Sequence, residues 1–138
     1  MTQQSNASGA CIAILVEDRQ SRLALDMTLR RAGYRTVLFE SGEDLLSFLA
    51  GHASASDRPD VLVADIEMPG GKGCKLISEL AEQALCLPAV IVTAQDIRQF
   101  EAELGERECF CYLRKPFHPE DLLDAVSTVI RQVGKQMA

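Results

Sequence analysis

Short apolar runs alternate with amphipathic segments along most of the chain. The apolar runs are rich in branched residues and predict five strands, at residues 11–16, 36–39, 61–64, 89–92 and 110–113. In the segments that follow, apolar residues recur at helical spacing, which predicts five helices. Strands that are apolar on both faces and alternate with helices are typical of a covered parallel sheet. The sequence therefore predicts an α/β fold, a doubly wound, five-stranded parallel sheet with helices on both faces.

The expected helices begin and end at residues suited to those positions. Gly33 follows the first helix where a C-terminal cap belongs. Ser41 begins the second helix, with an acidic residue three positions later as in a capping box. Pro119 suits the first position of the last helix. The third and fourth helices are expected around residues 76–84 and 97–104.

A chain of 138 residues is expected to form one domain. It occupies residues 11–133, between a disordered polar tail at 1–10 and a short tail at 134–138. Because the net charge is −6, the domain should not bind nucleic acid or an anionic membrane non-specifically. No apolar run reaches the roughly 18 residues that a membrane span needs. Residues 1–10 carry no secretion signal and the five cysteines are an odd number, so we expect reduced thiols and a cytoplasmic protein.

In a sheet of this kind, ligands bind outside the carboxyl ends of the strands. The polar residues expected there are Glu17, Asp18, Asp65, Thr93 and Lys115. Three carboxylates at one rim repel each other unless a cation joins them, and hard oxygen ligands suit Mg²⁺. A carboxylate can also attack a phosphoryl group, whose charge a lysine and a hydroxyl can neutralise. The pattern therefore predicts phosphoryl chemistry at a Mg²⁺ site.

Each of these residues has a simpler interpretation when it is taken alone. Asp18 can cap the first helix. Asp65 can be a turn residue, Thr93 an ordinary strand end, and Lys115 a solvated lysine. Their shared position at one edge of the predicted sheet favours a common site.

Four blocks of the sequence resemble the signature blocks of the response-regulator receiver (CheY-like) family. They are Ile-Leu-Val-Glu-Asp at residues 14–18, Val-Ala-Asp-Ile-Glu-Met-Pro at 63–69, Thr-Ala at 93–94 and Lys-Pro-Phe at 115–117. The 22-residue step from Thr93 to Lys115 also fits the family. The resemblance covers roughly residues 11 to 133. It implies a flavodoxin-like, CheY-like fold that accepts phosphate from a histidine kinase or a histidine phosphotransfer protein.

The resemblance also implies a role for each acidic residue. Asp65 would be the phosphoacceptor. Glu17, Asp18, Asp65 and the backbone carbonyl of Glu67 would bind Mg²⁺. Glu17 stands where the family more often has aspartate, a change that lengthens the reach toward the metal. The Glu67 side chain is either a solvated loop residue or, as a hypothesis, a group that tunes dephosphorylation.

Further positions gain roles from the same resemblance. Thr93 and Lys115 would hold the phosphoryl group, and Tyr112 would turn inward with Thr93 on activation. Gln95 occupies another position that the family uses to tune the lifetime of the phosphoryl group. The bond between Lys115 and Pro116 would be cis.

Two surfaces allow more than one interpretation. Residues 105–110 depart from the family's usual pattern before the fifth strand. Phe110 and Tyr112 should point to the same side of that strand, as a partner patch if exposed or as core if packed, and we favour core. The first helix has a basic face, which is either simply solvated, the default interpretation, or a docking surface for the phosphodonor. The residues of this face are Arg19, Arg22, Arg30 and Arg31.

The leading hypothesis is a stand-alone receiver that signals through a downstream output protein. It is not expected to be an enzyme, and formation of a homodimer is compatible with this function. A variant is the N-terminal receiver of a DNA-binding transcription regulator, because residues 39–41 and 115–117 resemble such receivers; this chain alone should not bind DNA. A different class is a small phosphohydrolase with Asp65 as nucleophile and Glu67 as acid. A degenerate receiver that never takes phosphate is disfavoured, because all the required groups are present.

Overall fold

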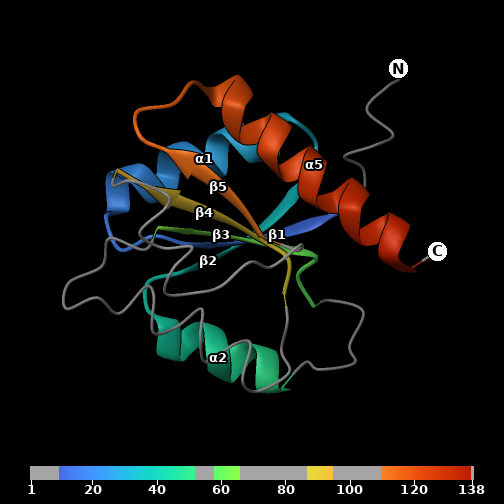
Figure 1. Cartoon of the computed structure of the whole chain (residues 1–138). Helices are drawn as coiled ribbons and strands as arrows, with labels where there is room; N and C mark the ends of the chain where they lie inside the picture. Colours follow the sequence, from blue (N-terminus) through green and yellow to red (C-terminus); the bar gives the residue numbers. More distant parts are fainter. Residues whose placement is uncertain (1–9, 52–57, 66–86, 95–109, 138) are drawn as a thin grey trace.

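A single parallel sheet forms the centre of the molecule in the computed structural model, which describes residues 10–51, 58–65, 87–94 and 110–137 (Figure 1). The strand order is β2-β1-β3-β4-β5, and every neighbouring pair is parallel. The predicted five-stranded parallel sheet is confirmed, and each strand ends within one residue of its predicted position. The strands are β1 (Cys11–Leu15), β2 (Arg35–Phe39), β3 (Val61–Asp65), β4 (Ala89–Thr93) and β5 (Phe110–Arg114).

Helices cover both faces of the sheet. On one face lie α1 (Arg19–Arg31) and α5 (Pro119–Met137), and on the other lies α2 (Gly42–Gly51) (Figure 1). The third and fourth predicted helices fall outside the described residues. The last helix continues past residue 133, where the predicted domain ends. The doubly wound arrangement is thus confirmed for the described helices.

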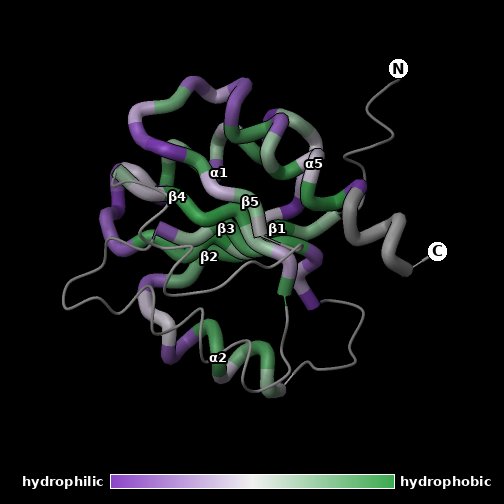
Figure 2. Tube along the Cα trace, in the orientation of Figure 1, coloured by the Kyte–Doolittle hydropathy of each residue, from purple (hydrophilic) through white to green (hydrophobic). Residues whose placement is uncertain are grey.

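The strands supply two apolar layers because successive side chains point to opposite faces. Ile14 of β1 belongs to the layer that contains Leu29 of α1 and the inner face of α5. The next residue, Leu15, belongs to the layer that contains Leu45 of α2. β1, β3 and β4 are apolar along almost their whole length (Figure 2). Both faces of these three strands are therefore buried, as expected for the centre of a covered parallel sheet.

The predicted helix signals act where they were expected. Gly33 has a φ of 100°, and its N–H donates to the carbonyl of Arg30 at 3.0 Å, which closes the end of α1. Ser41 Oγ accepts from the backbone N–H of Asp44 at 3.2 Å, at the start of α2. Pro119 is the first residue of α5. Local sequence therefore determines where these helices begin and end.

The amino-terminal edge of the sheet is closed by backbone and carboxylate contacts. The Cys11 N–H donates to Asp60 Oδ2 at 2.8 Å, and the Asp60 N–H donates to the Cys11 carbonyl at 2.7 Å.

Cys11 is buried and Cys111 is half-buried, and both are thiols, as predicted. None of the helices in the described ranges is long and apolar enough to cross a membrane.

Candidate functional site

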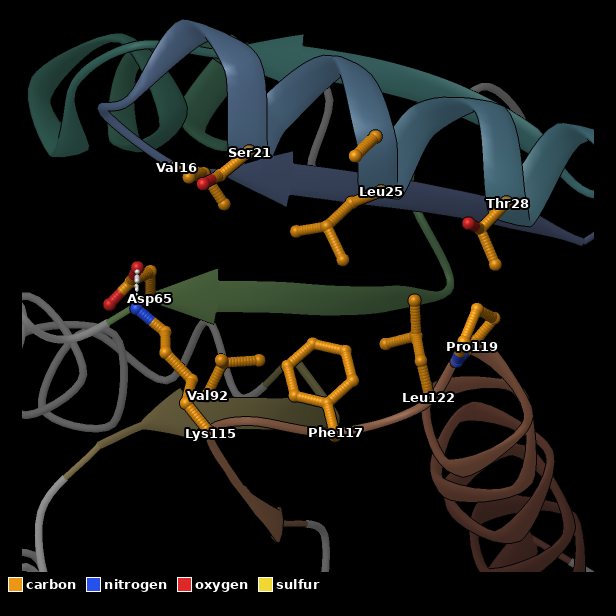
Figure 3. A pocket seen from close by; sticks show the side chains of 11 residues that line it. Val16, Ser21, Leu25, Thr28, Asp65, Val92, Lys115, Phe117, Pro119 and Leu122 are labelled. Atoms are coloured by element: carbon orange, nitrogen blue, oxygen red, sulfur yellow. Dashed lines mark hydrogen bonds and ion pairs between the residues drawn. The ribbon is translucent and has the colours of Figure 1, made fainter.

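Two oppositely charged side chains meet at the carboxyl edge of the sheet. Asp65 is the last residue of β3, and Lys115 directly follows β5. Lys115 Nζ lies 2.6 Å from Asp65 Oδ2, which makes a charge-assisted hydrogen bond (Figure 3). The predicted approach of these two residues is confirmed, although 50 positions separate them in the chain.

Thr93 completes the same edge from the strand between them. β4 lies between β3 and β5, and Thr93 is its last residue, with 0% of its surface exposed. The carbonyl of Thr93 accepts from the backbone N–H of Lys115 at 2.7 Å. The peptide bond between Lys115 and Pro116 is cis, as the family resemblance implies. The backbone therefore holds Thr93 and Lys115 together at the end of the sheet.

The acidic loop, Glu17-Asp18, follows β1, which pairs directly with β3. Asp18 is the N-cap of α1, and its Oδ2 accepts from the backbone N–H of Ser21 at 2.9 Å. Hydrogen bonds from the Ser21 backbone and hydroxyl lower the pKa of the Asp18 carboxyl, and the charges of Arg22 and Lys115 lower it further. Because β1 pairs directly with β3, the acidic loop follows its strand beside the strand that ends at Asp65.

The donor groups fit a hard divalent cation in kind. Glu17 and Asp18 in the loop after β1, and Asp65 at the end of the neighbouring strand β3, carry carboxylate oxygens, which are the ligands that Mg²⁺ prefers. In this structure the Asp18 carboxylate bonds to the Ser21 N–H, and the Asp65 carboxylate bonds to Lys115. Among the described residues, no three side chains of His, Cys, Asp or Glu lie close enough together to hold a metal ion. Glu67, whose carbonyl is a predicted ligand, lies outside the described ranges, as does Gln95.

A cavity opens beside the Lys115–Asp65 pair, between α1 and α5 (Figure 3). Its volume is about 300 Å³. The walls are mostly apolar, with Leu25 from α1, Phe117 from the loop after β5, and Leu122 from α5. The phosphoacceptor candidate thus lies at one end of an apolar space between two helices.

Tyr112 points into the layer covered by α2. Its side chain is half-buried, its hydroxyl oxygen is buried, and the ring packs against the cluster that contains Leu45 and Ile91. The core interpretation is therefore confirmed for Tyr112. The side chain of Phe110 and residues 105–109 lie outside the description of the structure.

The expectation of a solvated basic face on the first helix is wrong for Arg22. Only 8% of Arg22 is exposed, because it lies on the buried stripe of α1 with Asp26 and Leu29. The sequence contained this signal: position 22 precedes Leu29 by two helical turns and so lies on the same face. Arg30, in contrast, is exposed and pairs with Asp26 at 3.8 Å.

Comparison with known proteins decides the family. Residues 12–127 match the response regulator receiver domain. The chain belongs to the response regulator receiver family. Receiver domains are phosphoacceptor signalling domains of two-component systems rather than conventional enzymes, so the phosphohydrolase alternative is set aside.

Among curated proteins, this receiver resembles the DNA-binding transcriptional regulator NtrC of Klebsiella pneumoniae, with 35% identity over 124 residues. That match covers 89% of this chain and 25% of the relative. The response regulator MprA of Mycobacterium bovis is 31% identical, over 92% of this chain and 53% of the relative. The receiver spans about a quarter of the length of the first curated relatives it matches.

Solved receiver structures have the same fold. The response regulator receiver protein from Burkholderia phymatum has a TM-score of 0.71 and 30% identity, covering 88% of this chain and 95% of that one. A receiver domain protein from Clostridium thermocellum has a TM-score of 0.78 at 20% identity, covering 94% and 99% of the two chains. The second likeness shows the fold alone.

Proposed function

We propose that this receiver accepts a phosphoryl group on Asp65 from a histidine kinase or a histidine phosphotransfer protein. The observation that carries the proposal is the 2.6 Å ion pair between Lys115 Nζ and Asp65 Oδ2. A lysine held there is ready to pair with phosphoryl oxygens once the carboxylate has reacted. The buried Thr93 between the two strands supports the same conclusion.

The proposed reaction is an in-line transfer. A carboxylate oxygen of Asp65 attacks phosphorus, the new P–O bond forms as the donor's P–N bond breaks, and the bonding pair stays on the histidine nitrogen, which takes a proton from solvent. The Lys115 ammonium group moves from the carboxylate to the phosphoryl oxygens, and the Thr93 hydroxyl donates to one of them. Glu17 and Asp18, with Asp65, would hold Mg²⁺, which supplies further charge neutralisation.

The change in charge at Asp65 would alter the surface that a downstream output protein binds. We propose that Thr93 and Tyr112 move together in this response. Thr93 is the last residue of β4, and Tyr112 lies on the next strand, β5, which Lys115 directly follows. Glu67 and Gln95 remain predicted to tune the lifetime of the phosphoryl group. The cytoplasm, where response regulators generally work, is the proposed location.

A second candidate is that this receiver is one unit of a longer transcription regulator. The observation in its favour is that the matched relatives named DNA-binding transcriptional regulators are about four times as long as the aligned region. Sequence-specific DNA binding would then reside in a different domain. The length of the native gene product distinguishes the two candidates.

The test of phosphorylation is incubation with MgCl₂ and acetyl phosphate, followed by rapid quenching and intact mass measurement. We expect the wild type to gain the mass of one phosphoryl group, and Asp65→Asn or excess EDTA to abolish the gain. Asp124→Asn, at an exposed position on α5, is the matched control and should still be phosphorylated. The proposal is contradicted by an adduct that persists in Asp65→Asn. It is also contradicted if the wild type shows neither a phosphoryl adduct nor, after borohydride reduction, the homoserine side chain that an aspartyl phosphate at position 65 would yield.

A further inference from the structure

A buried arginine supports the loop that carries two of the predicted metal ligands. Arg22 lies on α1 with 8% of its surface exposed. Its Nη1 donates to the carbonyl of Val16 at 2.9 Å and to the carbonyl of Glu17 at 3.2 Å. Its Nη2 donates to Glu40 Oε1 at 3.4 Å. One guanidinium group thus reaches the end of β1, the acidic loop, and the residue after β2.

The contacts use both terminal nitrogens of the arginine side chain. A guanidinium group has five donors in a fixed plane, so one side chain can bond to several oxygens in different directions. The Glu40 side chain is 77% exposed, so its ion pair with Arg22 contributes little in water. The contact to the Val16 carbonyl is buried, the one to the Glu17 carbonyl is partly buried, and both link Arg22 to the loop itself.

We infer that Arg22 is a positioning residue that holds the acidic loop, Glu17-Asp18, in place for cation binding. The inference rests on the proposed function, since it assumes that this loop binds Mg²⁺. Without the guanidinium group, the carbonyls of Val16 and Glu17 lose a donor, and the loop has to rearrange or recruit water to satisfy them. Asp18 would then no longer be held at a fixed place beside the edge of β3.

The charge of Arg22 and its hydrogen bonds act on cation binding in opposite directions. A positive charge near the loop repels Mg²⁺, so loss of the charge alone should strengthen binding. Loss of the hydrogen bonds should weaken binding, because the ligands are no longer held in place. The sign of the change in Mg²⁺ affinity therefore separates the positioning role from a purely electrostatic one.

The decisive variant is Arg22→Met, which has a similar length and helix propensity but no donor. We expect its Kd for Mg²⁺, measured by titrating MgCl₂ into the ¹⁵N-labelled full chain and following amide shifts, to rise about 10-fold, as when other outer supports of metal ligands are removed. Metal-free amide exchange should also become faster at Ser21, whose N–H bonds to the Asp18 carboxylate. The amide of Leu62, bonded to Pro88 across the sheet, should not change.

Two further variants separate charge, fold and position. Arg19→Met removes the same charge from an exposed residue on the same helix, so Mg²⁺ binding should stay equal or become tighter. Arg22→Lys keeps the charge but replaces the two donor nitrogens that bond to the three oxygens with a single ammonium nitrogen. We expect it to weaken Mg²⁺ binding less than Arg22→Met does, and it serves as the test variant if Arg22→Met does not fold.

The outcomes are distinct. Tighter or unchanged Mg²⁺ binding in a folded Arg22→Met protein, or in Arg22→Lys if Arg22→Met is unfolded, overturns the inference. Unchanged exchange at Ser21 overturns it as well. If the wild type binds no Mg²⁺, the metal part of the proposed function fails, and the positioning role in Mg²⁺ binding fails with it. If Mg²⁺ binds but acetyl phosphate leaves no adduct, phosphorylation fails while the Arg22 result still stands.

Discussion

The carboxylate of Asp18 performs a structural task at the same place where a chemical one is proposed. It caps α1 through the Ser21 N–H, in the loop that follows β1 beside the neighbouring strand β3. Its pKa lies below the ordinary value of an aspartate, chiefly because the Ser21 backbone and hydroxyl donate hydrogen bonds to the charged form. Asp18 therefore stays ionised, and available to a cation, to a lower pH than a solvated aspartate would.

A prediction about pH follows at the scale of this residue. Because the folded-state pKa of Asp18 is lowered, its contribution to stability is present above the unfolded-state pKa and is lost as the pH falls through the folded-state value. Ser21→Ala removes the hydroxyl but keeps the backbone N–H, so the pKa of Asp18 should rise part of the way toward its ordinary value. The acid limb of unfolding should then move to higher pH.

Carboxyl ¹³C NMR of the metal-free protein measures this pKa directly. Ser47→Ala, at an exposed position in the middle of α2, is the control and should leave the titration of Asp18 unchanged. An equal or lower pKa in Ser21→Ala would show that the hydroxyl does not stabilise the charged carboxylate.

At the scale of elements, the end of α1 depends on one backbone conformation. Gly33 has a φ of 100°, in the left-handed region where a side chain is strained. The N–H of Tyr34 then donates to the carbonyl of Leu29 at 3.2 Å, which joins the helix to β2. The direction in which the chain enters β2 is therefore set at this residue.

Two glycine substitutions test this dependence against each other. Gly33→Ala should lower the free energy of unfolding by about 1 kcal/mol, because alanine resists the left-handed conformation. Gly51→Ala, at the exposed end of α2, meets nothing within 4 Å and should change it by nothing or raise it by about 0.5 kcal/mol. Urea unfolding of both variants measures the difference. Equal effects of the two substitutions would contradict the assigned role of Gly33.

The ends of helices and strands could largely be predicted from local sequence. The directions of side chains could not, for physical reasons. Gly33 and Ser41 mark helix ends because only a few residue types suit those backbone positions. Asp65 and Thr93 were expected just after their strands and lie inside them, because pairing continues by one residue. Whether Asp18 caps a helix or faces a metal depends on side-chain direction, which spacing does not contain. The helical position of Arg22 indicates its burial, but not its acceptors, the carbonyls of Val16 and Glu17 and the carboxylate of Glu40.

At the scale of the whole molecule, one sheet serves two apolar layers. Leu122 of α5 belongs to one layer and Leu45 of α2 to the other, and both are almost completely buried. The strands between them contribute alternate side chains to each layer, so exposure of one layer would remove support from the sheet that holds the other. We therefore expect the domain to unfold as one cooperative unit.

Truncation of each layer tests this cooperativity. Leu122→Ala and Leu45→Ala should each lower the free energy of unfolding by about 2–4 kcal/mol, as buried leucine deletions do. Leu23→Ala is the control, because Leu23 is 43% exposed, and should change it by less than about 0.5 kcal/mol. Circular dichroism and tyrosine fluorescence during urea unfolding should report one coincident transition in every variant. Separate transitions for the two layers would contradict a single unit.

The direction of α5 has a practical consequence for attaching this domain to a surface. The helix begins at Pro119, beside the cavity that Asp65 also lines, and its 19 residues carry the chain roughly 28 Å away. β1 begins at Cys11 and runs parallel to β3, which ends at Asp65, so these two residues lie at opposite ends of the strands. A dye or tether joined at the start of β1 or at the far end of α5 stands away from the acceptor. The domain can thus be immobilised by either end while donor proteins approach Asp65 from solution.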